Sequence, residues 1–394
     1  MVKSPGTQGR FVGELREQFA HKLVAMHGAA STAVVDAFGA VPRHLFVDQY
    51  YRIGKTRRLI RVDPRHPSAS QLKAIYSDLA LATHQRYGKG TSSTSQPSLV
   101  AYMLEELQIS PGMKILEIGA GTGWNAALMG NLVGPKGHVY SVDIQDDVAR
   151  QARRHIKRQG CLNVSIIHSD GGDGYRNNAP YDRIITTVAC PDISAHWLSQ
   201  LRDGGALLVT LQDIPGRSAC LLSRLWKRTD HLQGEVVGVP DFITLQGKYG
   251  TALLSPQQVD ERLQRLKAGR KPHRMPMAWR CWQPSMGPWL THELLFFAYL
   301  DGMSIEPIGQ HLVLRWGEGD SFCIPTEEDL LIYGTDDVYR KLREVMRKWL
   351  DLGAPRRDAF LIEVWPRSAA KRKPKDGWLV PRNHTQLIFR LKKS

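Results

Sequence analysis

The chain has 394 residues, of which 42% are hydrophobic and 23% charged, and its formal net charge is +15. This composition is typical of globular proteins, and the length suits two domains on a prior of roughly 100–200 residues per domain. No stretch reaches the ~20 uncharged apolar residues of a membrane-spanning helix. The N-terminus lacks the apolar run of a signal peptide. We therefore expect a cytoplasmic protein without a membrane partner.

The five cysteines are scattered, with no CxxC pair among them: Cys161, Cys190, Cys220, Cys281 and Cys323. An odd, unpaired set of this kind favours reduced thiols over a disulfide framework or a structural zinc site. We expect no metal.

The N-terminal 92 residues predict helices followed by an irregular, basic segment. Apolar residues recur at helical spacing between residues 9 and 50 (Leu15, Phe19, Leu23, Val24), with a second helix around 31–38. Residues 51–92 are polar and interrupted by prolines and glycines, which predicts loops. The basic residues between Arg52 and Arg65 favour acidic partners, or form a solubilising face.

From Pro97 the pattern changes to helices alternating with short apolar strands. A helix runs from Pro97 to the Pro111-Gly112 turn. Strands are then expected at 114–118, 137–142, 164–168, 182–188 and 206–211, and helices at 124–133 and 147–159. Such alternation predicts an α/β fold with a mostly parallel, doubly wound sheet.

Beyond residue 225 this rhythm stops, and an α+β accessory domain is expected. Thr335 or Asp336 can cap a helix, whose predicted apolar face is Val338, Leu342, Val345, Met346, Trp349 and Leu350. Strands are expected at 359–365 and 385–391. We therefore predict three segments: a helical and basic one (1–92), a cofactor-binding domain (93–225) and a substrate-recognition domain (226–394).

The strongest chemical signal is LEIGAGTGWNAAL, residues 116–128, in which a strand passes through a glycine-rich turn into a helix. Glycines let the backbone bend sharply and a ligand approach closely. The next strand ends at Asp143, whose carboxylate can accept both ribose hydroxyls, and the following one at Asp170-Gly171, which can face an adenine. Taken singly, any of these glycines could be a plain turn, and Asp143 a helix cap.

Glu117, just before the turn, indicates which cofactor binds. A carboxylate there would repel a pyrophosphate, whereas S-adenosylmethionine carries a sulfonium cation and no phosphate. The pattern therefore predicts a Rossmann-like class I methyltransferase that uses S-adenosylmethionine and releases S-adenosylhomocysteine.

Four blocks in order resemble the protein-isoaspartate carboxyl O-methyltransferases. They are VPRHLFV (41–47), TSQPSLVAYMLEEL (94–107), LEIGAGTGWNAAL (116–128) and SDGGDGY…APYDRIITT (169–187). The resemblance covers residues 10–225. It implies methylation of the α-carboxylate of an isoaspartyl residue, after which the ester closes to a succinimide.

The resemblance also implies residue roles. It makes Ser95 the active-site serine, flanked by Thr94 and Ser93. A cofactor set follows: Ser92, Glu117, Gly119, Ala120, Gly121, Thr122, Gly123, Asn125, Asp143, Ile144, Asp170 and Gly171. The alternative for Ser95 is a helix N-cap ahead of Pro97.

Two departures favour a narrower branch of the family. The serine-rich run SSTSQP replaces the usual Thr-Ile-Ser, and about 170 residues follow the catalytic part. This combination resembles the members found in lanthipeptide, lasso peptide and graspetide clusters. They methylate an aspartate side chain of a cyclised ribosomal precursor peptide, which closes to an aspartimide. We therefore expect a peptide substrate, acidic if it exploits the basic charge; repair of isoaspartyl proteins is the alternative.

Two weaker alternatives come from other classes. A nucleic-acid methyltransferase would suit the basic charge, and Cys190 could be its nucleophile, but Pro191 follows the cysteine in the reverse of the usual order. A non-catalytic peptide-binding module would be expected to have lost some of the motif residues, which are all present.

Overall fold

The computed structural model describes residues 13–15, 18–19, 31–52, 58–276, 289–326, 329–369 and 374–393. The chain divides into two compact units. The first comprises Met1–Val188 and His196–Val209, and the second comprises Ala189–Ala195 and Thr210–Ser394.

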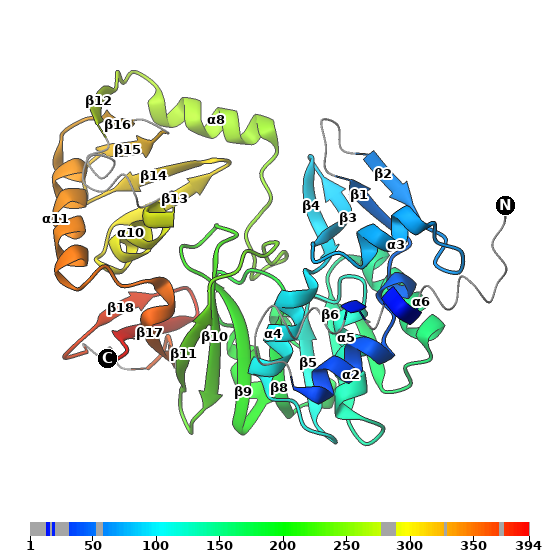
Figure 1. The fold of residues 1–394 in the computed structure, drawn as a ribbon. Coiled ribbons are helices and arrows are strands. Elements are labelled where there is room, and N and C mark those ends of the chain that lie inside the picture. Colours follow the sequence, from blue (N-terminus) through cyan, green and yellow to red (C-terminus); the bar gives the residue numbers. More distant parts are fainter. Residues whose placement is uncertain are drawn as a thin grey trace. The chain divides into compact units, whose positions relative to one another are not determined.

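The first unit contains a parallel sheet whose neighbouring strands all run in the same direction (Figure 1). In spatial order its strands are β9 (Leu201–Gln212, up to Val209 in this unit), β8 (Tyr181–Thr186), β5 (Lys114–Ile118), β6 (His138–Asp143) and β7 (Val164–His168). Helices α5 (Trp124–Val133) and α6 (Asp146–Gln159) follow β5 and β6, and α7 (Ala195–Gln200) precedes β9. The predicted Rossmann-like α/β fold is confirmed.

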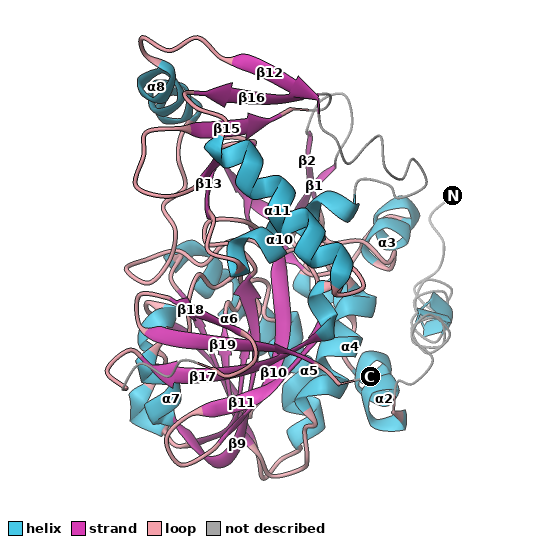
Figure 2. Ribbon diagram, turned by 90° about the vertical axis from the view of Figure 1, so that its left-hand side faces the viewer, coloured by secondary structure: helices cyan, strands magenta, loops and turns pink. Residues whose placement is uncertain are grey.

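Burial explains why these segments form a parallel sheet. Four of the five residues of β5 are buried, as expected where helices cover both faces and strands are apolar throughout. Helix α6 buries one stripe only, formed by Val148, Ala149, Ala152, His155 and Ile156. Figure 2 shows helices of this unit alongside the strands.

The segment before the sheet is more regular than predicted. It contains α2 (Thr32–Ala40), the 3-10 turn η1 (Arg43–Phe46), β1 (Gln49–Arg52), β2 (Arg58–Arg61), α3 (Ala69–Ile75), β3 (Leu81–Arg86), β4 (Lys89–Thr94) and α4 (Pro97–Leu107). The helix predicted at 31–38 is confirmed, whereas Leu23 and Val24 lie outside the described residues. The loops predicted at 51–92 are wrong, because β1–β2 and β3–β4 form antiparallel hairpins of short, polar strands.

The described residues of the second unit form two groups of antiparallel strands together with helices. One group has the order β18 (Trp378–Pro381), β19 (Thr385–Leu391), β17 (Phe360–Pro366), β11 (Leu232–Gly238) and β10 (Cys220–Lys227). The other is β12 (His273–Pro276), β16 (Asp329–Tyr333), β15 (Phe322–Pro325), β14 (His311–Arg315) and β13 (Ser304–Ile308). The helices are α8 (Pro256–Lys267), α10 (Trp289–Leu300) and α11 (Asp337–Asp351). This agrees with the expected α+β class.

Helix α11 begins after Asp336, which is its N-cap residue as predicted but makes no side-chain capping bond, and it buries most of its predicted apolar face. Trp349 is 2% exposed and joins the core of this unit. Leu350 was wrongly placed on that face, since it is 37% exposed. At 100° per residue it is turned away from the stripe that Val345 and Trp349 share.

Buried ions hold the second unit together. The Asp213 carboxylate accepts hydrogen bonds from Arg357 Nη1 at 2.7 Å and from Arg217 Nη1 at 3.2 Å. The Asp192 carboxylate accepts from the His384 backbone N–H and from Thr385 Oγ1, both at 2.5 Å. The segments 189–195 and 210–217 are thereby attached to the last forty residues of the chain.

Both predicted domain limits fall within strands. The limit after residue 92 lies in β4 and that after residue 225 in β10. The three-segment division stays a prediction. Among the described cysteines, Cys190, Cys220 and Cys323 are buried and Cys161 is half-buried, all as free thiols; Cys281 lies outside the described residues. No described helix is long and apolar enough to cross a membrane.

We predict that the buried ion pair contributes far more to stability than an exposed one. Arg357→Met should lower the free energy of unfolding by about 3–5 kcal/mol, because the fully buried Asp213 carboxylate loses its shorter arginine contact and Glu293 loses its partner Arg357. The matched control Arg340→Met breaks the exposed pair with Asp337 and should cost at most about 1 kcal/mol. Urea unfolding measures both. Equal losses in the two variants would contradict this ranking.

Candidate active site

The glycine turn between β5 and α5 requires its glycines for two reasons. Gly119, Gly121 and Gly123 have φ angles of 101°, 51° and 83°, in the left-handed region that other residues rarely adopt. A Cβ atom on Gly119 would lie 2.6 Å from Thr187 Oγ1, and one on Gly121 would lie 2.9 Å from the Ser93 carbonyl oxygen. The turn therefore packs directly against the serine-rich run.

Asp143, the last residue of β6, holds this turn in place. Its carboxylate accepts hydrogen bonds from the backbone N–H of Gly121 and of Gln145, both at 3.0 Å. The alternative that Asp143 is a helix cap is wrong, because Gln145 is the N-cap residue of α6 and that helix has no side-chain capping bond. Burial raises the pKa of Asp143. Each carboxylate oxygen can accept a second hydrogen bond, which leaves capacity for ribose hydroxyls.

Glu117 is fully buried, and its carboxyl is not the fully charged group that the sequence led us to expect. Its two oxygens accept from Asn125 Nδ2 at 2.7 Å and from Ser141 Oγ at 2.5 Å. Burial raises the pKa of Glu117 to about 7, with a further contribution from the negative charge of Asp143. Near neutral pH the carboxyl is therefore only partly ionised, and repulsion of a pyrophosphate is a weaker argument than the sequence implied.

Ser92 is the clearest sign that a ligand binds beside the turn. Its side chain is buried, and within the described part of the chain its hydroxyl has no hydrogen-bond partner. Ser92 Oγ lies 3.9 Å from the position of a Cβ on Gly121. A buried hydroxyl without a partner costs roughly 1–3 kcal/mol, a cost that a ligand or water bound at this position would offset.

Arg43, which the sequence did not single out, fixes the serine-rich run. Its side chain is fully buried and lies 5.0 Å from the centre of the Trp124 ring. Its guanidinium donates, at 2.7–3.4 Å, to the backbone carbonyls of Ile75, Ser77, Leu79, Thr94 and Ser95. Burial lowers the pKa of Arg43 to about 9, so it remains protonated at neutral pH. The available signal was a lone arginine in the apolar block VPRHLFV.

Ser95 is half-buried, and its hydroxyl makes no hydrogen bond to any residue in the described ranges. The alternative that Ser95 caps α4 is wrong, because Gln96 is the N-cap residue and makes no side-chain capping bond. Asp78 takes that role from a distant segment. Its carboxylate accepts from the Ser98 N–H and from Ser98 Oγ, both at 2.8 Å. The Ser95 hydroxyl therefore takes no part in capping α4.

A second buried network supports the far side of the turn. His155 on α6 lies 2.8 Å from the Thr122 carbonyl oxygen and 2.9 Å from Asp48 Oδ2. Asp48 also accepts from Arg158 Nη1 at 2.9 Å. The hydrogen bonds and charges of His155 and Arg158 lower the pKa of Asp48 despite its partial burial. Sequence reasoning missed both residues. Asp48 lies more than 70 residues before the turn, and His155 lies on a helix that follows it.

The remaining predicted residues lie at the same carboxyl edge of the sheet. The Ser169 N–H donates to the Asp143 carbonyl oxygen at 3.1 Å, which brings Asp170 and Gly171 next to the end of β6. Trp197 Nε1 donates to the Gly171 carbonyl at 2.9 Å. Ala120 and Thr122 are buried in the turn, and Ile144 is half-buried after Asp143.

Cys190 offers no support for a nucleic-acid methyltransferase. Its side chain is fully buried, and its backbone pairs with Thr210 and Gln212. A cysteine nucleophile must reach a flipped base, so this thiol is poorly placed for that chemistry.

We predict that Glu117 gives the protein an unusual pH dependence. Because the pKa of Glu117 rises on folding, from 4.5 to about 7, the folded chain holds more protons in this window. Its free energy of unfolding should fall as the pH rises, by at most roughly 1.4 kcal/mol per pH unit. Glu117→Gln should remove this decline, whereas the exposed control Glu318→Gln should keep it. Urea titrations at pH 5, 6 and 7 measure the slopes; parallel curves for wild type and Glu117→Gln would contradict the assignment.

Comparison with known proteins agrees with this architecture. The protein-L-isoaspartate(D-aspartate) O-methyltransferase family model matches residues 15–250, more than half of the chain. A protein-L-isoaspartate O-methyltransferase of Methanothrix thermoacetophila is 37% identical over 226 residues, covering 57% of this chain and 93% of the relative. One of Methanosarcina mazei is 35% identical over 218 residues, covering 55% and 78%.

A solved structure of a protein-L-isoaspartate O-methyltransferase has a similar fold, with a TM-score of 0.54 and 24% identity. The match covers 88% of this chain and 96% of the solved one, so it extends well past residue 250. The chain therefore belongs to the protein-L-isoaspartate(D-aspartate) O-methyltransferase family, and it is an S-adenosylmethionine-dependent O-methyltransferase.

Proposed function

We propose that the chain methylates the α-carboxylate of L-isoaspartyl residues in proteins or peptides. The observation that carries this proposal is the family match over residues 15–250, which includes the glycine turn, Asp143 and the Ser92–Ser95 run. The named relatives are protein-L-isoaspartate O-methyltransferases.

The residues present suit S-adenosylmethionine, which supplies an electrophilic methyl group when bound. Asp143 would accept the ribose hydroxyls, and Asp170 with Gly171 would face the adenine. The unpartnered Ser92 hydroxyl beside Gly121 would gain a hydrogen-bond partner. The glycines of the turn would let the cofactor approach its backbone closely.

Catalysis in this site would rest on alignment. The attacking carboxylate is already a nucleophile and needs no strong base. The Ser95 hydroxyl, which Arg43 positions through the Ser95 carbonyl, would donate a hydrogen bond to that carboxylate and orient it. Ser93 and Thr94 would set the approach of this strand to the turn. The C-terminal segment 226–394 would recognise the rest of the substrate.

The comparisons support the repair-type substrate over the aspartimide-forming branch. In the sequence analysis, the 170 residues after the catalytic part favoured the aspartimide-forming branch. However, the match to a solved protein-L-isoaspartate O-methyltransferase covers 88% of this chain. A long C-terminal part is therefore compatible with an isoaspartyl substrate, and the serine-rich run alone does not distinguish the two.

A pair of peptides tests the proposed substrate. A linear peptide with one L-isoaspartyl residue should accept a methyl group from labelled S-adenosylmethionine, whereas the same sequence with ordinary aspartate should not. The aspartyl peptide presents its carboxylate at a different position from the isoaspartyl peptide. Because catalysis depends on alignment, the enzyme should distinguish the two. A cyclised aspartyl peptide is the third arm. If only the cyclised peptide is methylated, and the product then loses methanol, the chain is an aspartimide-forming methyltransferase and our proposal is wrong.

We predict that Ser95 and Asp143 have separable roles. Ser95→Ala should leave the dissociation constant of S-adenosylmethionine nearly unchanged and lower kcat about 100-fold, the typical cost of losing one orienting donor. Asp143→Ala should weaken cofactor binding by about 1.5–3 kcal/mol, since a charged acceptor is lost. Calorimetry and single-turnover rates measure both.

The controls for these roles are exposed residues of the same types, Ser199→Ala and Asp146→Ala. Neither should change binding or turnover. A Ser95→Ala enzyme with normal kcat, or an Asp143→Ala enzyme that binds cofactor normally, would contradict the corresponding role.

A further inference from the structure

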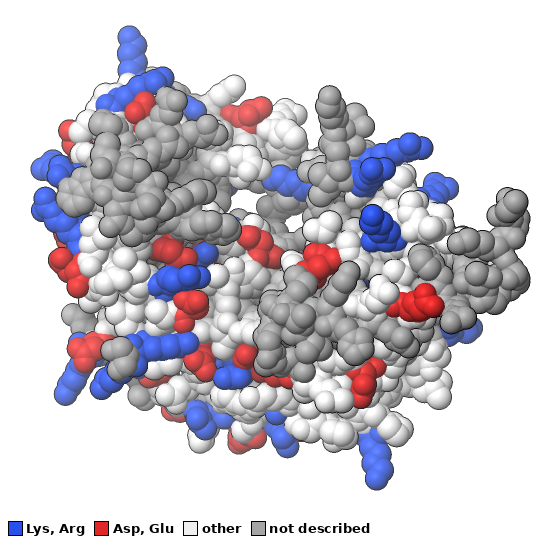
Figure 3. Space-filling view, viewed as in Figure 1, with Lys and Arg blue, Asp and Glu red and all other residues white. Residues whose placement is uncertain are grey.

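The hairpin formed by β1 and β2 presents a basic face. Arg52 and Arg58 lie directly opposite each other in the antiparallel register, and Arg61 lies opposite Gln49. All three arginines are exposed. Like charges directly opposite on two strands are destabilising, so folding alone does not account for this pair. Figure 3 shows Lys and Arg side chains gathered on this part of the surface.

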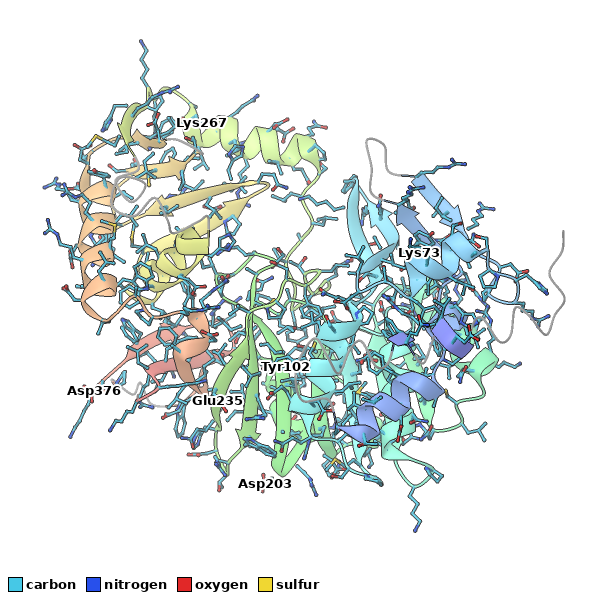
Figure 4. All side chains as sticks on the ribbon, viewed as in Figure 1. Lys73, Tyr102, Asp203, Glu235, Lys267 and Asp376 are labelled. Atoms are coloured by element: carbon cyan, nitrogen blue, oxygen red, sulfur yellow. The ribbon has the colours of Figure 1, made fainter. Side chains whose placement is uncertain are left out.

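Within the described chain, no carboxylate forms an ion pair with these three guanidinium groups. Asp63, the nearest acid in sequence, accepts instead from the Arg65 N–H at 3.0 Å and lies 3.1 Å from His66 Nδ1. Lys73 on the adjoining helix α3 is also exposed and adds positive charge at this end of the unit (Figure 4). The positive charge of the hairpin is thus left for an external partner.

The hairpin is firmly attached to the strands that lead into the candidate active site. Tyr50 and Val62 are buried in a core cluster with Leu81 of β3. Gln49 Nε2 donates to the Thr83 carbonyl of β3 at 2.9 Å. Strand β3 pairs with β4, which ends at Thr94, one residue before Ser95. The basic face is therefore joined to the serine-rich run through buried contacts and strand pairing within the first unit.

We propose that the basic face of Arg52, Arg58 and Arg61 binds an acidic stretch of the polypeptide substrate that flanks the methylated residue. The inference rests on the proposed function and names a substrate class for it. A polypeptide held at both places gains from the high effective concentration of the second contact. Opposite charges also speed encounter, an effect that salt suppresses. A polypeptide is favoured over a nucleic acid because the face adjoins the strands of a protein-carboxyl methyltransferase site.

The test compares isoaspartyl peptides flanked by four glutamates or four glutamines. At low salt, kcat/KM for the glutamate peptide should exceed that for the glutamine peptide by about tenfold, and the advantage should vanish at high salt. Arg52→Gln/Arg58→Gln should lose the advantage and keep kcat for the glutamine peptide. The matched control Arg154→Gln/Lys157→Gln, which removes two exposed charges from α6, should retain it.

Other outcomes overturn the proposal in distinguishable ways. An undiminished advantage in the hairpin variant, or equal loss in the control, would exclude this face. If a single-stranded oligonucleotide binds the wild type more tightly than the glutamate peptide does, and only the hairpin variant loses that binding, the partner is a nucleic acid. If neither peptide is methylated, the proposed function fails. Fluorescence anisotropy of the glutamate peptide with both variants then still decides the binding surface.

Discussion

The candidate site depends on one buried guanidinium. Arg43 supplies donors to five backbone carbonyls from two segments, 75–79 and 94–95. Arginine suits this role because its planar fork carries five donors and stays charged. Without it, each buried carbonyl would cost roughly 1–3 kcal/mol. The position of Ser92–Ser95 beside the glycine turn is therefore fixed by Arg43 together with the pairing of β4 with β3.

The turn itself is held from three directions. Asp143 bonds the Gly121 N–H, Thr187 Oγ1 donates to the Gly119 carbonyl at 2.6 Å, and His155 lies against the Thr122 carbonyl. Together with the serine-rich run, these contacts fix the loop before any ligand arrives. Such preorganisation is what a reaction that relies on alignment needs.

The sequence predicted correctly those helices and strands whose formation depends on neighbouring residues. Helix α5 and strands β5 and β7 have the predicted bounds, because apolar strands, a glycine turn and an amphipathic helix are each set by neighbouring residues. The β3–β4 hairpin was missed because its short polar strands are stabilised by pairing and by Arg43. The ionisation of Glu117 was misjudged because burial, which the sequence does not display, decides it. Leu350 was predicted to be buried but lies at the edge of the apolar face of α11, where its side chain is 37% exposed.

The buried carboxylates of the second unit determine how the chain could be shortened. The family match ends at residue 250. Asp192 and Asp213 precede that point, yet they bond to Arg357, His384 and Thr385, which follow it. A fragment cut at residue 250 would keep two acids that are buried in the intact protein and discard most of the groups that compensate them, Arg217 excepted. We therefore expect such a fragment to be less stable than the intact chain, so the end of the family match does not mark where the polypeptide can be divided.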